Sequence, residues 1–124
     1  APFSGDESCL DLSLLTPALA WLPENFAFNN AVEIVRLNGN ILWSLPEGFL
    51  MGAAATLREL HLQDNLLVDL NKAAIGATFP QLAVLNVSSN RLAKLPADLG
   101  QLRQLTELRC HDNRLEALPE SLTL

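Results

Sequence analysis

Leucine-like residues recur along the chain with a fixed internal spacing. In residues 82–96, apolar side chains fall at the first, fourth, sixth, eleventh and fourteenth positions, asparagine falls at the ninth, and proline ends the stretch. Residues 105–119 repeat this order, the stretch that begins at Val32 shares it, and the one that begins at Leu57 shares all but the proline. A fixed period of this length indicates stacked repeat units, each of which buries its apolar stripe against its neighbours.

A fifth, degraded unit precedes these four. We assign its start to Cys9, with Leu12 and Leu14 at the fourth and sixth positions and Pro17 in place of the asparagine. The units then begin at residues 9, 32, 57, 82 and 105, with spacings of 23, 25, 25 and 23 residues. We interpret residues 1–31 as an N-terminal cap with this degraded repeat, or alternatively as a helix and a loop, and 32–124 as four units, the last incomplete.

Each unit predicts a short strand followed by a return segment. Apolar positions 4 and 6 alternate with polar positions 3, 5 and 7, which is the period of a strand with one buried face. The alanine-rich returns 47–56 and 72–81 favour a turn of helix, which Pro80 should end. Residues expected to point inward from the returns are Phe26, Phe49, Phe79, Leu99 and Leu122.

The pattern L-x-x-L-x-L-x-x-N-x-L-x-x-L-P resembles the leucine-rich repeat family over residues 9–124. The 23-residue units that end in Leu-Pro resemble its intracellular, Ras-suppressor-like subclass. The resemblance implies an α/β solenoid, a right-handed superhelix shaped as a horseshoe arc, with a parallel sheet on the concave face and short helices or 3-10 turns on the convex face. It also implies a cytoplasmic protein-interaction module, since the cysteine-rich flanks of secreted members are missing.

The ninth-position asparagines are expected to be structural. A buried amide can bond backbone groups of its own and the adjacent turn, which the bend would otherwise leave unpaired. This predicted asparagine ladder consists of Asn40, Asn65, Asn90 and Asn113.

Strand positions that face away from the core are free to vary, so they are the candidates for partner binding. They include arginine, a frequent anchor at protein interfaces, beside polar and acidic groups. Alternatively, they form only a solvated face on which Glu59 pairs with Arg36 and Glu107 with Arg109. The predicted contacts are Arg36, Glu59, His61, Gln63, Asn86, Ser88, Glu107, Arg109 and His111.

Trp21 and Trp43 are placed at positions 13 and 12 of adjacent units, on one lateral rim. They form either a second contact patch or a packing contact with the degraded first unit, and we favour packing.

The composition of the chain argues against several classes of partner. The net charge of −6 and the absence of a basic run argue against nucleic acid, and no apolar stretch reaches the roughly 18 residues of a membrane span. Cys9 and Cys110 are placed at core positions as reduced thiols, and His61 and His111 lie two units apart, about 10 Å, too far for one metal. We therefore expect a protein partner, without metal, cofactor or catalysis in these residues.

Two other functions stay open. The chain could be the recognition arm of a larger kinase, GTPase or ubiquitin ligase. It could also be a scaffold that self-associates through an uncapped C-terminal end, and we expect the parent protein to continue beyond Leu124.

Overall fold

The computed structural model describes residues 8–22 and 32–119. Each strand is three residues long and is followed, after a wide turn, by a short helical segment or a loop. In chain order the elements are β1 (Cys9–Asp11), β2 (Ile34–Arg36), η1 (Met51–Ala53), β3 (Glu59–His61), η2 (Asn71–Ala73), α1 (Ile75–Thr78), β4 (Val84–Asn86), η3 (Ala97–Gln101) and β5 (Glu107–Arg109).

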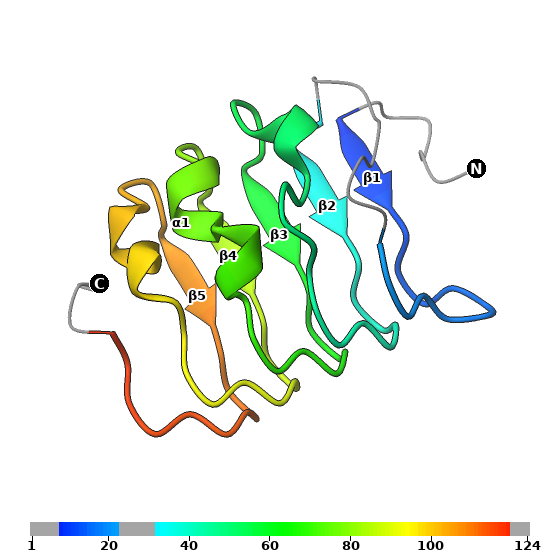
Figure 1. The fold of residues 1–124 in the computed structure, drawn as a ribbon. Coiled ribbons are helices and arrows are strands. Elements are labelled where there is room, and N and C mark those ends of the chain that lie inside the picture. Colours follow the sequence, from blue (N-terminus) through cyan, green and yellow to red (C-terminus); the bar gives the residue numbers. More distant parts are fainter. Residues whose placement is uncertain (1–7, 23–31, 120–124) are drawn as a thin grey trace.

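The five strands form one parallel sheet in the order in which they occur in the chain. Figure 1 shows the strands side by side on one face of an arc and the helical segments on the other. This is the predicted leucine-rich-repeat solenoid, with its sheet on the concave face. The predicted division into residues 1–31 and 32–124 stays a prediction, because much of the first segment lies outside the described residues.

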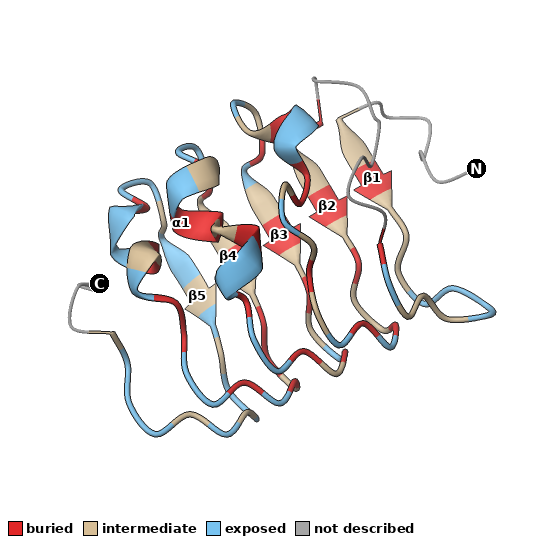
Figure 2. Cartoon of the chain, viewed as in Figure 1, coloured by how far each residue is buried: buried red, intermediate tan, exposed pale blue. Residues whose placement is uncertain are grey.

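One apolar core runs along the stack between the sheet and the return segments. The central residues of β2, β3 and β4 are fully buried, as the red bands across the strands in Figure 2 show. Phe49, Phe79 and Leu99 are also buried, as predicted, whereas Phe26 and Leu122 lie outside the described residues. The helical turns predicted in the two alanine-rich returns are present, and α1 ends at Thr78, two residues before Pro80.

The return segments of the third and fourth units touch each other closely. Gly76 of α1 lies against the backbone of η3, where an added Cβ would lie 1.8 Å from the carbonyl oxygen of Asp98. Only glycine permits this approach of two main chains.

The asparagine ladder joins neighbouring units. In Asn65, Oδ1 accepts a hydrogen bond from the N–H of Leu42 at 3.0 Å, and Nδ2 donates to the carbonyls of Leu37 at 3.0 Å and Leu62 at 3.1 Å. Leu42 and Leu37 belong to the preceding unit and Leu62 to its own, so one side chain closes the turns of two units. Asn40, Asn90 and Asn113 make equivalent bonds.

The first unit differs from its predicted alignment by two residues. The sheet pairs Leu10 with Val35 and Asp11 with Arg36, so the unit begins two residues before Cys9. Leu10 therefore occupies the core position assigned to Leu12, and Cys9 lies on the open face rather than in the core. The prediction was wrong because Leu10, Leu12 and Leu14 alternate regularly, and a slip of two residues preserves a period of two.

The residue at position 8 is left-handed in every described unit. Its φ is 51° at Leu14, 71° at Gly39, 58° at Asp64, 54° at Ser89 and 57° at Asp112. Glycine and aspartate tolerate this conformation better than leucine does. The turn geometry is thus common to all units although their residues differ.

Candidate partner-binding surface

A row of five polar side chains crosses the middle of the concave face. The sheet register aligns the third residue of each strand, so that neighbours in the row lie about 4.8 Å apart. The row mixes both charge signs with neutral hydrogen-bonding groups. From β1 to β5 it consists of Asp11, Arg36, His61, Asn86 and Arg109.

A second row, formed by the first residue of each strand, flanks the first. From β2 to β5 it alternates apolar and acidic side chains, so a partner there meets both kinds of contact within one strand spacing. It consists of Cys9, Ile34, Glu59, Val84 and Glu107.

One ion pair and one histidine–carboxylate contact connect the rows, and each lies within a single strand. Arg109 Nε lies 3.0 Å from a Glu107 carboxylate oxygen, which is one of the two pairs considered from the sequence. Glu59 pairs with Nε2 of His61 at 3.1 Å instead of with Arg36. Among the described residues Arg36 therefore has no ion-pair partner within 4.0 Å.

Two members of the central row each accept hydrogen bonds from a serine that lies two residues later in the chain. Ser13 donates its hydroxyl and its backbone N–H to the Asp11 carboxylate, and these bonds, with a smaller contribution from Arg36, lower the pKa of Asp11. Ser88 donates in the same way to Oδ1 of Asn86, at 2.7 Å from its hydroxyl and 3.1 Å from its N–H. Both serines thereby hold the orientation of the row.

Three predicted contacts, Gln63, Ser88 and His111, lie beyond the strand ends, and they differ in how accessible they are to a partner. Ser88 is only 5% exposed, so its hydroxyl orients Asn86 and is closed to a partner. Gln63 is half-buried, with an Oε1 that lacks a hydrogen-bond partner in the described part of the chain. His111 is exposed. Of these three residues, His111 is the most accessible to a partner.

The structure moves Asp11 and Cys9 relative to the predicted alignment. The alignment put Asp11 in the flanking row and Cys9 in the core, whereas the register puts Asp11 in the central row and Cys9 in the flanking row. The charged Asp11 two residues before Ser13, in the spacing of Asn86 and Ser88, was the sequence signal that could have fixed the alignment.

Trp21 and Trp43 are not packed against the first unit. Their exposed fractions are 69% and 59%, so the favoured interpretation of packing is wrong. Both lie on the edge where the chain leaves the sheet, separate from the two concave rows.

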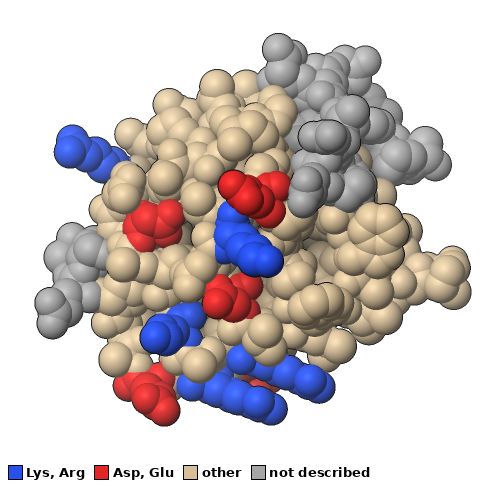
Figure 3. Space-filling view, viewed as in Figure 1, with Lys and Arg blue, Asp and Glu red and all other residues tan. Residues whose placement is uncertain are grey.

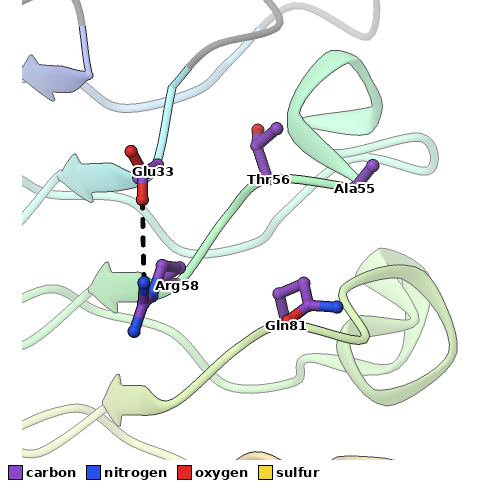
Figure 4. A pocket seen from close by; sticks show the side chains of 5 residues that line it. All are labelled: Glu33, Ala55, Thr56, Arg58 and Gln81. Atoms are coloured by element: carbon purple, nitrogen blue, oxygen red, sulfur yellow. Dashed lines mark ion pairs between the residues drawn. The ribbon is translucent and has the colours of Figure 1, made fainter.

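A pocket opens at the opposite edge, near the start of β2 and β3. It has a volume of about 340 Å³ and is lined by Glu33, Ala55, Thr56, Arg58 and Gln81 (Figure 4). Glu33 and Arg58 approach to 4.0 Å with both side chains largely in solvent, so this pair holds the pocket only loosely. Within the described ranges, no group of three or more His, Cys, Asp or Glu side chains could hold a metal ion.

Known proteins share this fold and its repeat. A sequence model of the family described as leucine rich repeat matches residues 55–115. Plant intracellular Ras-group-related LRR protein 8 of rice, Oryza sativa subsp. japonica, is 33% identical over 115 residues, covering 91% of this chain and 30% of the rice protein. Human leucine-rich repeat-containing protein 58 is 43% identical over 74 residues, covering 57% of this chain and 20% of the human one.

A solved LRR protein of Leptospira interrogans superimposes with a TM-score of 0.69 and 25% identity, over 90% of this chain and 28% of that one. The chain therefore spans less than a third of each of these three proteins. None of the helices in the described segments is long and apolar enough to cross a membrane. Leucine-rich repeats generally act as protein-interaction modules, and their fold is not itself catalytic. The repeat, the parallel sheet and these similarities together show that the chain belongs to the leucine-rich repeat family.

Proposed function

We propose that the chain binds a protein partner through its concave face, with Arg36, His61, Asn86 and Arg109 as the central contacts. Glu59 and Glu107 then select the charge of the partner. The observation that carries the proposal is the register of the central row, in which five polar side chains of four kinds stand on one sheet. A preformed surface binds with a smaller loss of conformational entropy than a flexible one.

The repeat itself supplies a control for this proposal. Core positions hold apolar side chains in β2, β3 and β4, so the fold dictates their chemistry. The central row holds aspartate, arginine, histidine, asparagine and arginine at one structural position, so the fold leaves this position free. Side chains at a position that folding does not constrain are free to be selected for binding to a partner.

The module would work in signalling or scaffolding in the cytoplasm. The location is supported by the rice relative, whose name describes it as intracellular. The same surface could equally serve as the recognition arm of a longer protein that carries an enzyme domain. In either case the contacts are those of the concave rows.

Affinity capture from cell extract with matched variants tests the proposal. The concave variant Arg36→Glu/Arg109→Glu should lose a partner that wild type captures. The control variant Arg58→Glu/Arg103→Glu makes the same change of charge at two exposed arginines outside the concave rows, and should keep the partner. Circular dichroism checks that both fold. Equal capture by all three proteins contradicts the concave proposal.

A further inference from the structure

Large apolar side chains stand in solvent where the chain leaves the sheet. This edge carries Trp21 of the first unit, Ile41 and Trp43 at positions 10 and 12 of the second, and Val68 at position 12 of the third. Their exposed fractions are 45% to 69%. Backbone hydrogen bonds join neighbouring units here, including one from Val68 N–H to the carbonyl of Trp43 at 3.4 Å. We call these four residues the apolar half of the descending rim.

The same edge is charged in the fourth and fifth units. Positions 10 and 13 there carry Arg91, Lys94 and Arg114, all exposed, which we call the basic half of the descending rim. The same kind of backbone hydrogen bond joins the units here. Arg91 N–H donates to the carbonyl of Leu67 at 2.8 Å, and Arg114 N–H to that of Leu92 at 2.9 Å. Figure 3 shows Lys and Arg side chains gathered at the lower edge of the molecule in this view.

The change from apolar to charged side chains indicates that the backbone geometry of the rim does not depend on apolar residues. Arg91 and Arg114 occupy the position of Ile41, and Glu116 occupies that of Trp43 and Val68, within the same backbone geometry. Two exposed tryptophans with two exposed aliphatic side chains form a patch of the kind that marks interaction sites.

Within residues 8–22 and 32–119, the basic half makes no ion pair. Arg91 and Arg114 stand at the same position of adjacent units, about 5 Å apart along the rim, where like charges repel. Neither they nor Lys94 form an ion pair with any other described residue. Adjacent unpaired arginines present several N–H donors that a carboxylate can accept in bidentate fashion.

The two halves together set the length of a ligand. Trp43 and Arg114 are three units apart, so the distance along the rim is about 15 Å. An extended segment rises about 3.3 Å per residue and covers this distance in four to five residues. Asp69 and Glu116 border the rim at positions 13 and 12 and would repel a ligand carboxylate. Ligand carboxylates therefore fit best against the arginines at position 10.

We propose that the descending rim binds an extended acidic segment of a partner protein. Apolar side chains of the segment pack on Trp21, Trp43 and Val68, and its carboxylates pair with Arg91 and Arg114. The carboxylate at Arg114 is four to five residues from the side chain on Trp43. This site is separate from the concave rows, so it can act with them or without them.

Selection from a random dodecapeptide library displayed on phage provides the test. The wild-type chain should enrich peptides that carry an aromatic or aliphatic residue and, four to five residues away, aspartate or glutamate. Fluorescence polarisation then gives the affinity of an enriched peptide for each variant. Trp43→Ser and Arg91→Glu/Arg114→Glu should each weaken binding at least tenfold, while Arg58→Glu/Arg103→Glu should change it less than twofold.

The concave variant Arg36→Glu/Arg109→Glu should also bind the peptide within twofold of wild type, which separates this site from the proposed function. The proposal is overturned if no peptide is enriched, if enriched peptides lack acidic residues, or if the rim variants bind as wild type does. It is also overturned if sedimentation shows a wild-type dimer that Trp43→Ser disperses, because a second copy would then cover the apolar half.

Discussion

Two stretches of the chain have almost the same sequence and very different surroundings. Residues 89–96 read SNRLAKLP and residues 112–119 read DNRLEALP. In the first stretch Leu95 is 5% exposed, whereas its counterpart Leu118 is 54% exposed. The difference teaches that the repeat pattern determines the local path of the chain, while burial depends on the neighbouring unit.

The same difference extends through both units. The middle residue of β4, Leu85, is fully buried, whereas that of β5, Leu108, is half-buried. Asn90 is 9% exposed, while Asn113 makes equivalent bonds in a half-buried position. Identical side chains should therefore contribute unequally to the stability of this chain.

Leucine truncation should separate the two stretches most strongly. Leu95→Ala removes a buried side chain and should lower the free energy of unfolding by about 2–4 kcal/mol. Leu118→Ala should lower it by less than about 1 kcal/mol, since more than half of that side chain is already in water. Urea unfolding followed by circular dichroism measures both, and equal losses would refute the difference.

The asparagines should show the next largest difference. Asn90→Ala leaves the N–H of Leu67 without its acceptor, and the carbonyls of Leu62 and Val87 each lose one of two asparagine donors. The free energy of unfolding should fall by about 2–3 kcal/mol. Asn113→Ala should lower it by about 1 kcal/mol, because water can replace the lost bonds. The control Asn71→Ala changes an exposed side chain and should have almost no effect. A loss from Asn113→Ala as large as that from Asn90→Ala would contradict this account.

Thiol labelling compares the two units without unfolding the chain. Cys110 occupies the position in the fifth unit that Val87 occupies in the fourth. Partial burial raises the pKa of the Cys110 thiol, so it should react with iodoacetamide more slowly than a free thiol at pH 8.

A thiol at position 87 should react at least tenfold more slowly still, because Val87 is fully buried. Cys9→Ser isolates Cys110, and Val87→Cys with Cys9→Ser and Cys110→Ser isolates the buried site. Mass spectrometry follows both reactions. Faster labelling at position 87 would show that the fourth unit opens more easily than its burial implies.

The exposed ion pair of β5 should have the smallest effect. Arg109 and Glu107 are both about half in solvent, so their coupling in a double-mutant cycle should be between 0 and about 1 kcal/mol. Thermal unfolding of Arg109→Ala, Glu107→Ala and the double variant measures this coupling. A coupling above 2 kcal/mol would mean that the concave charges serve stability rather than binding.

Much of the fold follows from the periodicity of the sequence. The four asparagines and the leucines around them predict the turns, the strands and their parallel order, because only stacking buries each apolar stripe. The alanine-rich returns and Pro80 likewise predict the helical turns and the end of α1.

Other features depend on information that periodicity lacks. The slip at Leu10 kept the alternation intact, so periodicity alone does not reveal it, whereas the observed pairing with Val35 does. The choice of Glu59 between His61 and Arg36 depends on side-chain rotamers. The exposure of Leu118 and Trp43 depends on which residues cover them. The spacing of the leucines does not predict those covering residues.

Photo-cross-linking tests the concave proposal most directly. A photo-reactive benzoylphenylalanine replaces Asn86 in the middle of the central row, and in a second protein replaces Gln101 on η3, on the opposite face. After irradiation with the captured partner, the account predicts a cross-link from position 86 and none from position 101. A cross-link from position 101 alone would contradict binding through the concave face.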